Sequence, residues 1–117
     1  MNTAIIYGIP NCDTVRKARK WLEDHHVAYD FVDLREQTPS RARISTWLKT
    51  LGADTLINRR STTFKQLSSD AKTLLEGDDP VAVLLEHPTL IKRPVLEYDG
   101  GLVVGFTADE YTTRWPG

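Results

Sequence analysis

Residues 7–14, with the sequence YGIPNCDT, decide the fold, because they join a predicted strand to a predicted helix. Before them, residues 3–7 form a β-branched and aromatic run, which predicts a buried strand that ends near Gly8. After them, residues 14–26 carry apolar side chains at helical spacing among charged ones, which predicts an amphipathic helix. A second strand is predicted at residues 29–32. This order predicts two parallel strands joined by a right-handed crossover.

The middle of the chain, at about residues 39–88, is predicted to be helical. One helix should begin after Ser40, a capping residue, and stop at Gly52. Further helical segments are predicted over residues 64–75 and over residues 80–86, where Pro80 suits a first helical turn.

The end of the chain returns to strands. Residues 95–98 and 102–104 flank Asp-Gly-Gly at 99–101, a strong hairpin signal, and residues 107–110 (TADE) have the form of a capping box that opens a last helix. We therefore predict an α/β fold: one domain over residues 1–117 with a thioredoxin-like core, a mixed four-stranded sheet, and a helical insertion at about residues 39–88.

Composition predicts an ordinary globular protein. Hydrophobic residues make up 40% of the 117 and charged residues 26%. The 15 basic and 16 acidic side chains leave a net charge of -1, which offers no electrostatic footprint for nucleic acid or for an anionic membrane. No apolar run approaches the length of a membrane span, and no signal peptide precedes the first strand. We expect a cytoplasmic monomer that binds neither nucleic acid nor membrane.

Cys12 is the one cysteine of the chain, so it cannot form an internal disulfide. At the start of a helix, unpaired backbone N–H groups and the helix dipole favour the thiolate over the thiol. Arg16 and Lys17 could add to this effect, whereas Asp13 opposes it. The alternative is a small buried hydrophobic residue, which most free cysteines are. One cysteine without a histidine cluster cannot assemble a zinc site, so we predict no metal.

Two arginine segments could bind an anion. Residues 58–63 (NRRSTT) lie between apolar segments, and residues 91–95 (IKRPV) enter a strand through a proline. A guanidinium group can bind an oxyanion or a carboxylate with a planar pair of donors. The alternative for each arginine is a solvated charge on a loop.

Together these segments resemble the arsenate reductase (ArsC)/Spx family. The resemblance is carried by residues 7–14, with Lys-Ala at 17–18 and Trp-Leu at 21–22, by residues 58–64 and by residues 91–94. It covers nearly the whole chain and is closest to the YffB-like branch of the family. It implies a thioredoxin fold with a helical insertion in a cytoplasmic bacterial protein. In the arsenate reductases a thiolate attacks the oxyanion, arginines stabilise the thiolate and the arsenate, and glutathione and glutaredoxin resolve the adduct.

Carried over to this sequence, the resemblance implies that Cys12 is the nucleophile and that Arg60 and Arg93 are catalytic arginines. The implied substrate-binding residues come from the same segments: Asn11, Thr14, Arg16, Lys92 and Pro94, the last at the position of the family's cis-proline. The function expected is an arsenate reductase-like thiol oxidoreductase with no bound cofactor, with glutathione as co-substrate and glutaredoxin as a candidate partner.

The sequence departs from the arsenate reductases in two places. Their His-Asn-Pro before the cysteine is replaced by Gly-Ile-Pro at 8–10, and a late arginine is replaced by residues 103–106 (VVGF). Losing one cationic donor to a buried oxyanion costs about 1.5–3 kcal/mol, so we expect little arsenate reduction. The alternative function is a non-enzymatic Spx-like module that binds RNA polymerase or another protein. Val15 stands where a Cys-x-x-Cys redox sensor needs its second cysteine. A third alternative is a family member without catalysis.

Overall fold

A computed structural model describes residues 4–99 and 101–115 of the chain. The chain divides into two compact units, one made of Met1–Asp33 with Arg93–Gly117 and the other of Leu34–Lys92. We call them the sheet unit and the helical unit. The predicted insertion at about residues 39–88 falls within the helical unit.

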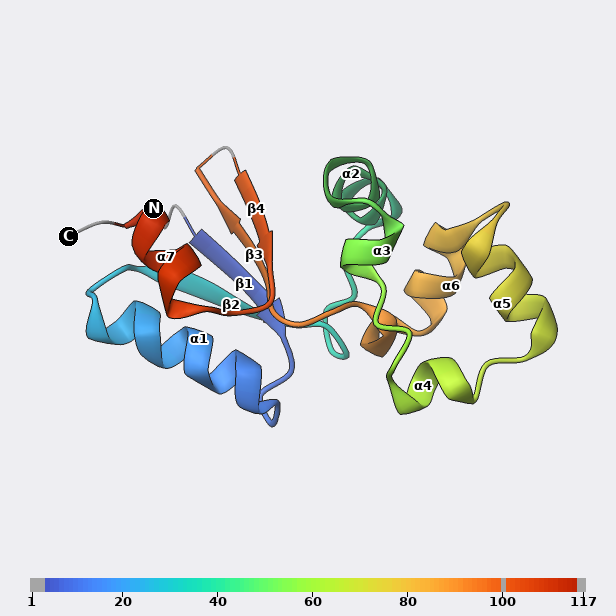
Figure 1. The fold of residues 1–117 in the computed structure, drawn as a ribbon, viewed down its shortest axis with the longest axis horizontal. Helices are drawn as coiled ribbons and strands as arrows, with labels where there is room; N and C mark the ends of the chain where they lie inside the picture. Colours follow the sequence, from blue (N-terminus) through green and yellow to red (C-terminus); the bar gives the residue numbers. More distant parts are fainter. Residues whose placement is uncertain (1–3, 100, 116–117) are drawn as a thin grey trace. The chain divides into compact units, whose positions relative to one another are not determined.

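The sheet unit holds a mixed four-stranded sheet in the order β2-β1-β3-β4 (Figure 1). β1 runs parallel to β2, whereas β3 is antiparallel to both β1 and β4. The elements are β1 (Ala4–Gly8), α1 (Asp13–Asp24), β2 (Tyr29–Asp33), β3 (Val95–Tyr98), β4 (Gly101–Val104) and α7 (Ala108–Arg114). The mixed four-stranded sheet and its parallel first pair are as predicted, and the hairpin strands and last helix form where expected.

The core of the sheet unit lies between the sheet and the two helices α1 and α7. Alternate residues of β1, Ala4 and Ile6, are buried in one cluster with Ala18, Trp21 and Leu22 of α1. The same cluster includes residues of β3, β4 and α7, namely Leu96, Val103 and Tyr111. One face of β1 and the helically spaced apolar residues of α1 therefore meet in one layer, and β1 is a largely buried strand, as predicted.

The helical unit consists of short helices: α2 (Arg41–Leu51), α3 (Ala53–Leu56), α4 (Thr62–Lys65), α5 (Ser69–Glu76), α6 (Pro80–Glu86) and the 3-10 turn η1 (Pro88–Leu90). Side-chain oxygens of Ser40, Ser61, Ser68 and Asp79 cap four of them. The predicted ends of α2 at Ser40 and Gly52 and the bounds of α6 are confirmed.

The predicted helix over residues 64–75 is wrong in one respect, because two helices occupy this stretch. α4 ends at Lys65, and α5 starts afresh after Ser68, whose Oγ accepts a hydrogen bond from the N–H of Ala71 at 3.1 Å. Serine competes for backbone groups in this way and favours a helix start over a helix interior. The apolar spacing continues across the break, so a prediction from periodicity alone treats the two helices as one.

A short antiparallel contact joins two distant segments of the helical unit. Ile57 and Ile91 form an isolated β-bridge. On either side of it, the N–H of Asn58 donates to the carbonyl of Leu90 at 2.7 Å, and the N–H of Lys92 donates to the carbonyl of Leu56 at 2.8 Å. The contact brings the first arginine segment against the start of the second.

Candidate functional site

Cys12 is the N-cap residue of α1, with extended backbone angles φ -99° and ψ 126°. Its N–H donates to the carbonyl of Ile9 at 3.3 Å, and its carbonyl accepts from the N–H of Arg16 at 2.9 Å. Its side chain makes no capping hydrogen bond and is partly exposed. The sulfur is therefore anchored through its own backbone at the N-terminal end of a 12-residue helix.

Two charged neighbours of Cys12, Asp13 and Arg16, form an ion pair with each other. Nη1 of Arg16 lies 3.0 Å from Oδ1 of Asp13, and Nε of Arg16 donates to the carbonyl of Pro10 at 3.4 Å. Arg16, predicted to bind substrate, thus also ties the loop before the helix to its first turn. Its ion pair also places a positive charge against the Asp13 carboxylate next to the cysteine.

The other two predicted residues of this loop, Asn11 and Thr14, flank the cysteine. Asn11 is exposed and Thr14 partly buried. Within the described part of the chain, neither side chain makes a hydrogen bond of its own, so their polar groups are available to a ligand.

The Arg93–Pro94 peptide bond is cis, as predicted. Pro94 is buried directly before β3, and its carbonyl accepts from the N–H of Gly105 at 2.9 Å. Because Tyr7 of β1 pairs with Val95 of β3, Pro94 stands at the end of the sheet where β1 gives way to the cysteine loop. Arg93 is half-buried, and its Nε atom is fully so. Contact between Arg93 and Cys12 stays a prediction.

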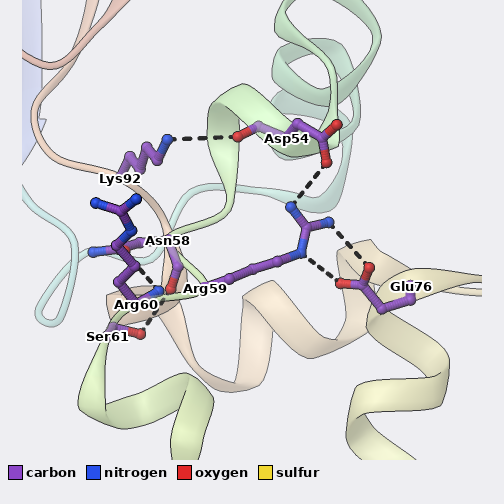
Figure 2. Close-up of polar contacts among 7 residues, drawn as sticks. All are labelled: Asp54, Asn58, Arg59, Arg60, Ser61, Glu76 and Lys92. Atoms are coloured by element: carbon purple, nitrogen blue, oxygen red, sulfur yellow. Dashed lines mark hydrogen bonds and ion pairs between the residues drawn. The ribbon is translucent and has the colours of Figure 1, made fainter.

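The two adjacent arginines of the first segment differ completely in their surroundings (Figure 2). Arg59 donates from Nε and Nη2 to both carboxylate oxygens of Glu76, at 2.9 and 3.1 Å, and from Nη1 to Asp54 at 2.9 Å. The hydrogen bond to Glu76 is the main cause that raises the pKa of Arg59 above its ordinary value. Arg60 is exposed, and among the described residues its guanidinium has no partner. Of the two, Arg60 is thus the arginine available to a ligand.

Lys92 is the predicted residue of the second segment that belongs to the helical unit. Its backbone pairs with Leu56, and its Nζ donates to the carbonyl of Asp54 at a long 3.5 Å. Figure 2 shows Arg59 running toward Asp54 and Glu76, whereas Arg60 leaves the turn on the other side, where Lys92 also lies. Arg60 and Lys92 are therefore two cations of the arginine segments that no carboxylate among the described residues neutralises.

Sequence reasoning missed the two acids that bind Arg59. Asp54 lies five residues before it and Glu76 lies 17 residues after it. Neither spacing marks an ion pair, because the contact depends on how α3 and α5 pack around the turn. The turn itself has a local signal, since asparagine and serine three residues apart favour side-chain to backbone hydrogen bonds.

Elsewhere in the helical unit, a cavity of about 480 Å³ is lined by Thr63, Gln66, Leu67, Ser68, Ala71, Leu74, Glu86 and His87. It contains none of the predicted site residues. Over residues 4–99 and 101–115, no three His, Cys, Asp or Glu side chains are grouped to hold a metal ion, and no helix is long and apolar enough to cross a bilayer.

Comparison with known proteins identifies relatives over nearly the whole chain. The model of the ArsC family matches residues 7–113. The solved structure described as "YFFB (PA3664) protein" is 42% identical, with 95% of this chain and 97% of that chain covered and a TM-score of 0.86. An arsenate reductase (ArsC) related protein from Brucella melitensis is 40% identical, with 98% and 95% covered and a TM-score of 0.73. The fold is thioredoxin-like, as predicted.

Similarity extends to regulators as well as to reductase-related proteins. The global transcriptional regulator Spx of Listeria monocytogenes is 33% identical over 111 residues, which cover 90% of this chain and 81% of the regulator. Similarity alone therefore does not separate an enzyme from a regulator. That distinction depends on the chemistry of the site.

Proposed function

The chain belongs to the ArsC family, and on this premise we propose that it is a thiol oxidoreductase with Cys12 as nucleophile and glutathione as co-substrate. One observation carries the proposal: a partly exposed cysteine is the N-cap of α1, and its sulfur is not used as a cap. A structural cysteine in a core would be shielded from substrates, and this one is not. The ion pair between Asp13 and Arg16 partly offsets the negative charge beside the cysteine.

With a mixed disulfide of glutathione as substrate, the cycle is two exchanges. The Cys12 thiolate attacks the glutathione sulfur, the substrate thiolate leaves, and a mixed disulfide forms on the enzyme. A second glutathione thiolate attacks that disulfide, releasing Cys12 as thiolate and forming glutathione disulfide. The external thiol is required because the chain has one cysteine and no internal resolving partner. Glutaredoxin could supply the resolving thiol instead. Such chemistry suits a reducing, cytoplasmic compartment.

The remaining predicted residues receive binding roles in this proposal. The Arg93 guanidinium binds a carboxylate of glutathione or an anionic substrate, and the backbone at Pro94 pairs with the substrate chain, as an added strand would. Arg60 and Lys92 bind an anionic group of the substrate, since neither cation is neutralised by a carboxylate among the described residues.

Arsenate is a poor candidate substrate. Where arsenate reductases carry a late arginine, this chain has residues 103–106, which end β4 and turn at Gly105 with φ 80°. We expect little arsenate turnover with glutathione and glutaredoxin.

The test is formation and decay of a glutathione adduct on Cys12. Purified protein is mixed with glutathione disulfide, and the adduct is followed by mass spectrometry, with the urea-unfolded chain as the reference for an unassisted cysteine. We expect the folded protein to react about tenfold faster or more, and Cys12→Ser to form no adduct. Equal rates in the folded and unfolded chains would remove the basis of the proposal.

The similarity to Spx favours a second function, a protein-interaction module that binds RNA polymerase. Val15, fully buried, leaves it without the Cys-x-x-Cys of a redox sensor. Co-elution with purified bacterial RNA polymerase, retained in Cys12→Ser, together with slow adduct formation, would favour the module over the enzyme.

A further inference from the structure

We propose that Arg59 is a positioning residue, whose ion pairs with Asp54 and Glu76 hold the turn of residues 58–61 so that Arg60 and Lys92 stay available to an anionic ligand. The inference rests on the proposed function for the identity of that ligand, a substrate or co-substrate with a carboxylate or oxyanion. In this scheme Arg59 touches no ligand itself, and its role is to hold Arg60 and Lys92 in place.

Three hydrogen bonds, made to two carboxylates, connect Arg59 to two different helices. Its fork binds Glu76 at the end of α5 with two hydrogen bonds, and its remaining nitrogen binds Asp54 in α3. A planar guanidinium can do this and an ammonium group cannot, because the donors diverge from one rigid plane. Arg59 therefore fixes the turn against both α3 and α5.

The turn that Arg59 anchors is itself closed by hydrogen bonds. Oδ1 of Asn58 accepts from the N–H of Arg60 at 3.1 Å, and Oγ of Ser61 donates to the carbonyl of Asn58 at 2.9 Å. The same Oγ accepts from the N–H of Phe64 and so caps α4. The direction in which Arg60 leaves the backbone is thus set on both sides of the residue, and Arg59 ties that assembly to the rest of the unit.

Arg59 also forms ion pairs with two carboxylates of the same unit, those of Asp54 and Glu76. Asp54 receives Arg59 on its side chain and Lys92 on its backbone carbonyl, so it belongs to both groups (Figure 2). Without Arg59, the Asp54 and Glu76 carboxylates would lose their cation and could attract Arg60 or Lys92. An anionic ligand would then have to compete with two internal acids for the same cations.

The ion pairs contribute little to stability, which separates a positioning role from a structural one. The Arg59 side chain is 31% exposed, Glu76 is 48% exposed and Asp54 is 97% exposed. Exposed ion pairs of this kind have small effects on unfolding. Replacing Arg59 should therefore change anion binding far more than it changes the urea midpoint.

A matched control exists in the same unit. Arg41 binds both oxygens of Asp79 at 3.3 Å, with side chains 58% and 40% exposed. Arg41→Gln removes one positive charge and one bidentate ion pair from the helical unit, as Arg59→Gln does, but leaves the turn of residues 58–61 alone. The two variants share the change in net charge and the loss of a bidentate ion pair, and Arg59→Gln additionally loses the ion pair with Asp54.

The experiment is a sulfate titration of the whole protein, followed by the backbone amide signals of Arg60, Ser61 and Lys92 in ¹H–¹⁵N correlation spectra. In the wild type and in Arg41→Gln we expect these signals to shift together at similar sulfate concentrations. Arg59→Gln should weaken the apparent affinity about tenfold, as expected if misplacement of Arg60 or Lys92 costs the ligand one charge-assisted contact. Arg59→Lys should recover part of it, because it restores the charge without the fork.

Two results would overturn the proposal: Arg59→Gln titrating like Arg41→Gln, or wild-type signals of the three residues that do not respond to sulfate. Kinetics give an independent readout. Arg59→Gln should raise the glutathione disulfide concentration that gives a half-maximal rate of adduct formation on Cys12, while the rate of Cys12 alkylation by neutral iodoacetamide is unchanged. A fall in the alkylation rate would indicate general disruption and count against a positioning role. Absence of thiol exchange in the wild type would refute the proposed function alone, because the sulfate titration still decides the role of Arg59.

Discussion

The side chain of Tyr111 is completely buried, and its hydroxyl has no hydrogen-bond partner among the described residues. The ring is well accommodated: it meets Phe106 edge-on at a centroid distance of 4.8 Å and Trp21 at 5.5 Å. Tyr111→Phe therefore keeps the ring contacts and removes one oxygen that lost its water on folding. We expect this variant to be more stable than the wild type.

The magnitude follows from the cost of burying an unsatisfied polar group, about 1–3 kcal/mol. The packing term is small because phenylalanine fills the same ring position and leaves a gap of one oxygen atom. With a urea m-value of about 1.5 kcal/mol per molar, the midpoint of unfolding should rise by roughly 1 M at an unchanged slope.

The matched control is the same substitution at Tyr7, which is also buried but whose hydroxyl donates to Oε1 of Glu97 at 3.0 Å. Tyr7→Phe breaks a hydrogen bond to a charged group and should cost about 1.5–3 kcal/mol. Removing one phenolic oxygen thus has opposite signs at the two positions. Urea unfolding followed by circular dichroism and tryptophan fluorescence measures both.

Alkaline pH provides a second check on Tyr111. Burial raises the pKa of its phenol, so the proton is lost from the unfolded chain, near pH 10, before it is lost from the folded one. Above about pH 10 the unfolded state binds fewer protons, and this group lowers stability by up to about 1.4 kcal/mol per pH unit. The advantage of Tyr111→Phe should therefore widen from about pH 8 to about pH 11. A destabilised Tyr111→Phe would show that the hydroxyl is satisfied, and a constant difference across this range would show that folding does not shield the phenol from water.

Three further expectations follow from local contacts, each measured by urea unfolding. Gly8→Ala would place a Cβ 2.6 Å from Cγ2 of buried Val15 and should cost about 1–3 kcal/mol; an unchanged midpoint would show that the start of α1 can yield. Ser40→Ala removes the cap of α2 and should cost about 1 kcal/mol, whereas Ser40→Gly should cost only a few tenths; equal losses would contradict a capping role. The hydrogen bond from Arg41 lowers the pKa of Asp79, so its contribution is present near neutral pH and lost as the pH falls; Asp79→Asn should reduce the loss of stability between about pH 6 and pH 3, and an identical acid profile would refute this.

Local signals in the sequence were sufficient for most elements. Serine before α2, proline at the first turn of α6 and threonine before α7 each stand at the helix start that they predicted. The cysteine loop was equally readable, because a strand that ends in glycine and an amphipathic helix leave little choice about where Cys12 lies. These signals act within a few residues, so no tertiary contact was needed to interpret them.

The break between α4 and α5 shows where such signals conflict. Apolar spacing continued across residues 66–68, while Ser68 offered a cap for a new helix. The cap prevailed because its hydrogen bond to the backbone is compatible with a helix start and costs a continuing helix one of its own.

The family resemblance singled out Arg60, but only the tertiary structure shows why the adjacent Arg59 is not available to a ligand. In the sequence Arg59 and Arg60 are chemically identical neighbours. In the fold, α5 carries Glu76 to within hydrogen-bond distance of the first, while the second is left exposed without a partner among the described residues. The same holds for Tyr111: the sequence predicted the helix that carries it, but neither the burial of its ring nor a hydroxyl without a partner among the described residues. Both outcomes depend on which side chains the packing of distant segments brings together, and no spacing along the chain encodes that distance.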